Sequence, residues 1–165
     1  MSWTNSDGLV VRFGTDKGTE KESGSTEANV HRTLVHKFAF GDIANTDVTA
    51  ADPESPFIPA DSVITRATLY VTTAFASGGA GVLDIGLKVA AGTNTNDAAI
   101  DASIAVTVLD AIGDTINCNG AYVSSSVGNL TGLRITADQY IMTTWDTAAF
   151  TAGAATLVVE YLLLA

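Results

Sequence analysis

Residues 63–75, Val-Ile-Thr-Arg-Ala-Thr-Leu-Tyr-Val-Thr-Thr-Ala-Phe, decide the fold class of this chain. Apolar side chains of one parity run along the whole stretch: Val63, Ala67, Leu69, Val71 and Phe75. Arg66, Thr68 and Thr72 lie on the other parity. Because successive side chains of a β-strand point to opposite faces, this two-residue period predicts a long strand with one buried face.

A glycine-rich turn and a second alternating run follow directly. Residues 78–81 read Gly-Gly-Ala-Gly, and the apolar parity of residues 82–89 comprises Leu83, Ile85, Leu87 and Val89. Two alternating runs around such a turn predict a hairpin or meander. Further β-type runs lie at 30–40, 115–123, 130–135, 140–145 and 154–164. No helical crossovers separate them, so the pairing is expected to be mostly antiparallel. The expected sandwich interior consists of Leu69, Val71, Phe75, Leu83, Ile85, Leu87, Val158 and Tyr161.

One segment, Asn96–Ala105, carries the signals of a short helix. Asn96 or Asp97 can cap it, alanine favours it, and Ile100 and Ile104 are spaced four apart. The sequence therefore predicts an all-β protein, an antiparallel, jelly-roll-like β-sandwich with one short helix and an extended N-terminal segment. We expect residues 1–29 to form that N-terminal arm and residues 30–165 to form the sandwich domain.

The N-terminal arm combines three features. Trp3 is a lone large aromatic in a polar segment, so it is a candidate anchor for a neighbouring protein. Leu9–Phe13 is a short β-type run after the turn signal of residues 5–8. Residues 14–27 contain no apolar side chain, so we expect a mobile arm or an exposed loop there.

Charge and composition exclude several classes of function. The 165 residues carry 18 acidic and 8 basic side chains, a formal net charge of -10. This sign repels phosphate backbones and anionic lipid surfaces, so neither nucleic acid nor membrane is an expected partner. The first residues resemble no secretory signal, and no apolar run has the length of a membrane span. We expect the chain to be made in a cytoplasm and not exported.

The sequence offers little catalytic chemistry. His31 and His36 are five apart and would point to opposite faces of one strand, so they do not form a metal pair. Cys118 is the single cysteine, and a buried hydrophobic role fits it better than a nucleophilic one. Acids of 110–114 read as solvated loop residues rather than as a cation site. We therefore expect no enzyme activity, no metal and no cofactor.

A short motif occurs twice. Residues 74–82 and 149–157 both fit A-F-x-[AS]-G-[GA]-A-x-[VL], and both lead into a β-type run. We interpret the pair as two similar turns, in which a Phe closes the sandwich edge and a Gly allows the tight return. Gene duplication is the weaker explanation, because nothing around the motif repeats.

Residues 58–75 also carry a resemblance to a known family. They are similar to a segment of the form I-P-A-x-A-x-I-T-x-A-x-[VLY]-x-V-T-T-x-F in small structural proteins of tailed bacteriophage virions, especially capsid decoration (cement) proteins. The strand at 82–87 and the chain end at 148–161 extend the similarity, and residues 3–9 match more loosely. The resemblance implies a β-sandwich in a virion and carries over no catalytic residue.

The resemblance implies a decoration protein on the outer head surface, with the major capsid protein lattice as partner and a homotrimer as assembly. The candidate capsid or protomer interface residues are Trp3, Leu9, Val11, Phe13, Phe57 and Ile58. Two alternatives stay open. A receptor- or carbohydrate-binding module of a head or tail fibre would show clustered exposed aromatics around a groove, and a hydrolase would show two converging acids in a pocket.

Overall fold

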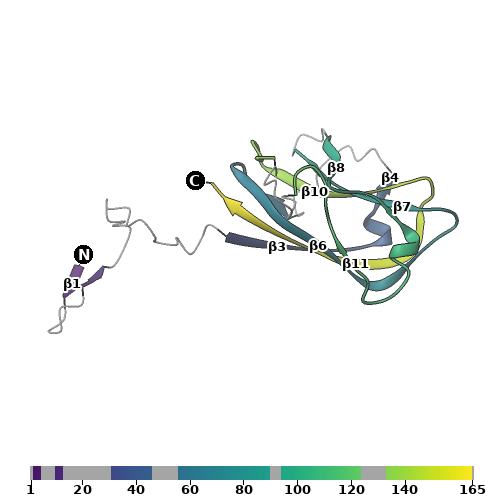
Figure 1. The fold of residues 1–165 in the computed structure, drawn as a ribbon, viewed down its shortest axis with the longest axis horizontal. Coiled ribbons are helices and arrows are strands. Elements are labelled where there is room, and N and C mark those ends of the chain that lie inside the picture. Colours follow the sequence, from purple (N-terminus) through teal and green to yellow (C-terminus); the bar gives the residue numbers. More distant parts are fainter. Residues whose placement is uncertain are drawn as a thin grey trace.

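The computed structural model describes residues 2–4, 10–12, 31–45, 56–89, 94–123 and 133–164. Two larger sheets face each other, and a separate two-stranded sheet lies near the N-terminus (Figure 1). The described residues contain no α-helix, and hence none that could cross a membrane. The predicted all-β sandwich is confirmed.

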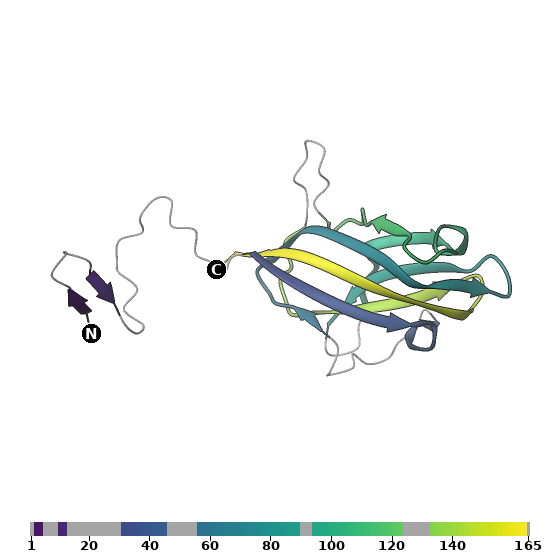
Figure 2. The ribbon, with the colours of Figure 1, turned by 90° about the horizontal axis from the view of Figure 1, so that it is seen from below.

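The first large sheet has the order β3–β11–β6–β9 and is antiparallel throughout. Its strands are β3 (His31–Ala39), β11 (Phe150–Leu163), β6 (Ser62–Ser77) and β9 (Thr115–Asn117). The three long strands lie side by side in Figure 2, where β3 is blue, β11 yellow and β6 blue-teal. The long strand predicted from residues 63–75 is therefore the third strand of this sheet.

The second large sheet has the order β4–β10–β7–β8, and β5 also pairs with β10. Its strands are β4 (Ala44–Asn45), β5 (Phe57–Ile58), β7 (Val82–Lys88), β8 (Asn94–Ala105) and β10 (Gln139–Asp146). Only the two-residue pairing of β4 with β10 is parallel. Two short 3-10 turns, η1 (Phe40–Asp42) and η2 (Val106–Val108), follow β3 and β8. The N-terminal sheet consists of β1 (Ser2–Thr4) and β2 (Val10–Arg12).

The core fills the space between the two large sheets. Its completely buried side chains include Leu69, Leu83, Ile85, Leu87 and Leu157. Most of these lie on the predicted parities of β6 and β7, which confirms the alternation seen in the sequence. β11 differs from expectation at one position. Odd-numbered residues face the core there, so Leu157, Val159 and Tyr161 are buried, whereas Val158, expected inside, is not among the core residues.

A β-bulge moves the buried face of β6 by one residue. Arg66 lies opposite Glu160, but Ile64 lies opposite Tyr161, so Thr65 is an extra residue in β6. The bulge reverses the parity of the strand before it. Ile64 is therefore the completely buried residue, and Val63, which the unbroken alternation placed inside, is not in the core.

The predicted helix at Asn96–Ala105 is wrong, because these residues form most of strand β8. The strand pairs with β7 from Leu87 opposite Asn96 to Val82 opposite Ala105, with several register shifts. This pairing buries Ile100 and Ile104 against the core. Tertiary contacts thus override a modest helix propensity.

The repeated Ala-Phe motif brings its two aromatic side chains together where β6 ends and β11 begins. Phe75 and Phe150 are both buried, with ring centroids 5.3 Å apart in an edge-to-face arrangement. Gly153 of the second motif has φ of 129° and lies so close to the Phe75 ring that a Cβ there would clash. Glycine thus supplies both the conformation and the space at this corner.

Candidate interaction surfaces

The N-terminal interface candidates lie on a small sheet of their own. β1 and β2 are antiparallel, with Trp3 directly opposite Val11. Leu9 and Phe13 lie outside the described residues. Among the described strands, neither β1 nor β2 pairs with the two large sheets. The short strand predicted at 9–13 is present at Val10–Arg12.

The two candidates on β5 have opposite environments. Phe57 is 45% exposed, and its ring centroid lies 5.7 Å from that of Tyr140 on the neighbouring strand. Ile58 is 0% exposed and belongs to the core. Adjacent strand residues point to opposite faces, which accounts for the difference. Only the Phe57 side chain therefore offers surface to a partner.

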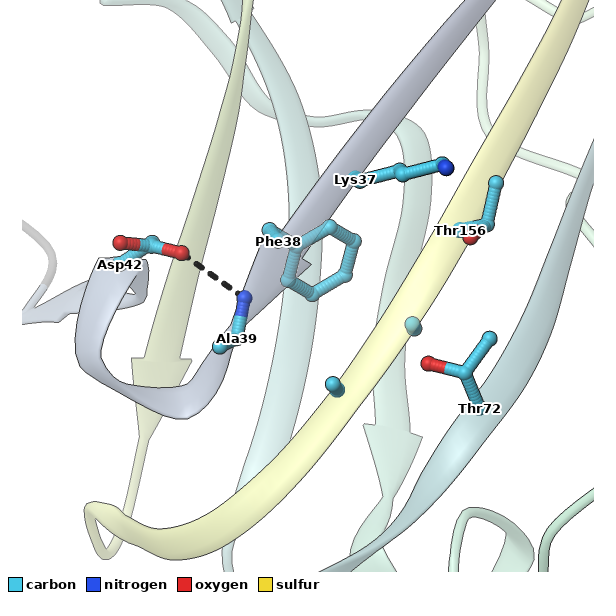
Figure 3. Close-up of a pocket in the computed structure, with 8 residues that line it drawn as sticks. Lys37, Phe38, Ala39, Asp42, Thr72 and Thr156 are labelled. Carbon is cyan, nitrogen blue, oxygen red and sulfur yellow. Dashed lines mark hydrogen bonds between the residues drawn. The ribbon is translucent and has the colours of Figure 1, made fainter.

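The outer face of the first large sheet carries a shallow depression of about 510 Å³. Its lining residues are Lys37, Phe38, Ala39, Asp42, Thr72, Ala154, Ala155 and Thr156. Figure 3 shows the Lys37 side chain extending toward Thr156, and the Asp42 carboxylate accepting the Ala39 N–H at 2.8 Å. Small side chains on β11 leave this face open.

Apolar side chains flank the depression on the same face. Val35 lies opposite Val158, and Tyr70 lies opposite Thr156, so these four side chains cross the sheet from β3 to β6. Val35 and Tyr70 are both well exposed. Val108 and Ile112, which lie between β8 and β9, are also exposed. Exposed apolar groups of this kind are typical of surfaces that contact other proteins.

Asp101 and Cys118 form a buried polar pair. Asp101 is buried, accepts the Ala102 N–H at 2.8 Å, and is hydrogen-bonded to the Cys118 thiol. Burial is the main cause that raises the pKa of Asp101, and a nearby Asp84 adds to it. Burial, helped by Asp101, also raises the pKa of Cys118 to about 12. The thiol is therefore protonated at neutral pH, as expected for a buried structural cysteine.

Replacing Asp101 with Asn is expected to stabilise the protein at pH 7. The folded-state pKa of Asp101 lies above its unfolded value, so the folded chain takes up this proton first as the pH falls. The penalty for the buried charge is therefore largest at neutral pH and fades toward about pH 4. Urea unfolding at both pH values measures the difference. If the wild-type chain and Asp101→Asn had the same free energy of unfolding at pH 7, the expectation would be wrong. It would also be wrong if the difference between them grew as the pH was lowered.

The two histidines lie in different environments, and among the described residues neither belongs to a cluster of possible metal ligands. His31 is exposed, whereas His36 stacks on Phe38 with centroids 5.6 Å apart. Burial lowers the pKa of His36, and the nearby Asp42 partly opposes this shift. Within the described parts of the chain, no cluster of three His, Cys, Asp or Glu side chains has the arrangement of a metal site.

Comparison with known proteins places the fold. No protein-family model matches the sequence, and no curated protein matches it either. A chain in the acidic stable capsid structure of Helicobacter pylori bacteriophage KHP30 superposes with a TM-score of 0.55 at 12% identity, over 82% of this chain and 90% of that one. A chain in the capsid of Ralstonia phage GP4 has a TM-score of 0.44 at 16% identity, over 81% and 85%. The first similarity shows a shared fold.

Proposed function

We propose that this chain is a structural protein of a bacteriophage virion that binds the outer head surface and stabilises the coat lattice. The observation that carries the proposal is the fold shared with a chain of a phage capsid structure across 82% of this chain. The motif resemblance of residues 58–75 points the same way from the sequence. A structural role also agrees with the buried, hydrogen-bonded state of Asp101 and Cys118.

The mechanism we propose is additive. Each copy contributes modest apolar burial and hydrogen bonding across a seam between coat subunits. A ligand that binds only the assembled shell stabilises it by mass action, and many symmetric copies sum these contributions. The exposed apolar side chains, such as Val35, Val108 and Ile112, provide contact area of the required kind.

Purified particles of the phage that encodes this chain test the proposal directly. Mass spectrometry is expected to find the chain in the virion, and a density map is expected to place its sandwich on the outside of the head. Particles that lack the chain should lose DNA at a lower temperature than complete particles. A chain absent from virions, or one located on a tail fibre, would overturn the proposal.

The assembly is proposed to be a homotrimer, because cyclic closure covers the apolar side faces of each copy. Sedimentation equilibrium at micromolar concentration is expected to give three times the 17.0 kDa mass of the chain. A monomer both in solution and on the particle would contradict the trimer, without bearing on head binding itself.

Deleting residues 1–8 is expected to abolish head binding and leave the melting temperature nearly unchanged. The deletion removes β1 and Trp3, the residue opposite Val11, while the two large sheets keep all their pairings. A terminal strand can pair with a partner's edge, and a large aromatic can fill a pocket beside it. Co-sedimentation with heads that lack the protein measures binding, and thermal unfolding measures stability.

The matched variant for that deletion is Phe57→Ala, which removes the exposed aromatic of β5 instead. The N-terminal attachment predicts nearly normal head binding for Phe57→Ala. Normal binding after the deletion, combined with weak binding of Phe57→Ala, would move the attachment to the loop before β5.

A further inference from the structure

The sheets of this protein have edges of very different length and cover. β4 and β5 have two residues each, and β9 has three. β8 is longer, but the N–H groups of Gly120 and Tyr122 donate to its Ile100 and Ala99 carbonyls, so a neighbouring segment covers part of it. Short or covered edges are how β-proteins avoid pairing with other chains.

β3 is the exception. It has nine residues, borders the first sheet, and pairs on one side with β11 (Figure 2). No other strand of the described residues pairs with its second side. An edge of this length presents a row of backbone donors and acceptors, which an extended segment of another chain can join.

The backbone groups on the open side can be assigned to particular residues. The Ala39 N–H donates to the Asp42 carboxylate, so it points away from β11 and closes this end of the edge. The ladder between β3 and β11 runs without a register shift. Since backbone groups alternate in an antiparallel ladder, Thr33, Val35 and Lys37 also direct their N–H and C=O away from β11.

The charge of the edge contrasts with that of the chain. Residues 31–39 contain Arg32 and Lys37 and no acidic side chain, although the whole chain has a net charge of -10. Two carboxylates lie nearby. Asp42 is held by the Ala39 N–H, and Glu160 lies between Thr33 and Arg66 across the sheet. Arg32 and Lys37 lie on opposite faces of β3, because they are five residues apart. Among the described residues Lys37 forms no ion pair, so its exposed ammonium group is the cation that the outer face of the open edge offers.

We propose that the open edge of β3, at Thr33–Lys37, is a docking site for an extended, carboxylate-bearing segment of a different protein. The segment adds a fifth strand to the first sheet and exchanges backbone hydrogen bonds with Thr33, Val35 and Lys37. An acidic side chain of the segment lies beside Lys37, and an apolar one lies beside Val35, which is 53% exposed. Pairing of two β3 edges from two copies is a poor alternative, because the second β3 brings Lys37 and no carboxylate to the edge.

The edge is a property of the isolated chain, so its test requires no phage particle. The probe is the capped peptide Thr-Glu-Thr-Val-Thr-Glu-Thr. Its residues have the same order in both directions, so it presents the same side chains to β3 in parallel and in antiparallel pairing. The matched control peptide has Lys in place of both Glu residues. Amide hydrogen exchange of the full chain, followed residue by residue by NMR at millimolar peptide, reports the added hydrogen bonds.

The acidic peptide is expected to slow exchange of the Val35 amide about tenfold when its concentration is about ten times its Kd. The lysine peptide should give no protection. Val35→Pro should abolish the effect, because proline removes the N–H on the open side and is tolerated at a strand edge. Val35→Thr, which keeps that N–H, should retain the effect, and Lys37→Glu should reverse the preference between the two peptides.

Three results would overturn the proposal. One is the absence of protection by the acidic peptide at Thr33, Val35 and Lys37 in the wild-type chain. Another is equal protection by the acidic and the lysine peptide, which would show that the docking site does not select a carboxylate-bearing segment. The third is protection that rises with protein concentration alone, which would make the occupant a second copy. If Val35→Pro does not fold, Lys37→Glu and the two peptides still decide between these results.

Discussion

Phe75→Ala is expected to lower the free energy of unfolding by about 3–5 kcal/mol, the range for a buried Phe cut back to Ala. Phe75 is 3% exposed, and its ring contacts Phe150 and Phe38 at centroid distances of 5.3 Å and 6.4 Å. It also packs directly on the backbone of Gly153. These neighbours come from two strands of one sheet, β3 and β11, whose pairing holds them in place, so they cannot collapse together to fill the space that the ring leaves.

Urea unfolding of the variant, followed by circular dichroism, measures this loss. Phe40→Ala is the matched control, because it removes the same ring from η1, where the side chain is 44% exposed. We expect the control to cost less than about 1 kcal/mol. If Phe75→Ala lost as little stability as the control while the fold stayed intact, the face of β6 that carries Phe75 would not be buried.

Gly86→Ala is expected to cost roughly 3 kcal/mol, at the upper end of the range for overpacking. A Cβ on Gly86 would lie 2.6 Å from the Asn96 carbonyl oxygen and from the Cα and carbonyl oxygen of Asp97. All three atoms belong to the backbone of β8, so no side-chain rotation relieves the clash. The methyl group can be accommodated only if β7 and β8 move apart.

Gly78→Ala is the control for this substitution. Gly78 lies in the turn between β6 and β7, and a Cβ there would meet no heavy atom within 4 Å. Its effect on the unfolding midpoint in urea should therefore stay within about 0.5 kcal/mol. Equal effects of the two substitutions would show that β8 does not approach Gly86 so closely, and would place the register of the β7–β8 pair in doubt.

The two proposed contact regions use different parts of the chain. The N-terminal hairpin offers a short strand and Trp3, whereas β3 offers a long open edge with Lys37. The deletion of residues 1–8 leaves β3 complete, and Val35→Pro leaves the hairpin complete. Measured on the same heads, the two variants separate attachment through the terminus from attachment through the sheet edge.

The sequence by itself determined the fold class and much of the core. The alternation at 63–75 and 82–89 predicted β6 and β7, and it placed Leu69, Leu83 and Ile85 inside before any tertiary contact was known. Such alternation has one physical cause, a strand with one face against the core, so local pattern is sufficient to recognise it. The lone Cys118 was also correctly expected to be buried.

The candidate interface was predictable only in part. The pattern of Leu9–Phe13 predicted a short strand, and Val10–Arg12 forms one, but which surface it serves stays a prediction. Phe57 and Ile58 were both named as candidate interface residues. Pairing of β5 with β10 gives them opposite faces, so Phe57 is exposed and Ile58 lies in the core.

Only the tertiary structure decided the remaining features, because each depends on which strand lies beside which. A spacing of four between Ile100 and Ile104 suits one face of a helix and one face of a strand equally, and pairing with β7 selects the strand. Because of the bulge at Thr65, the core contains Ile64 and not Val63. No local pattern in the sequence indicates this bulge. The open edge of β3 follows from strand order alone, since a residue sequence does not state which strand remains without a neighbour.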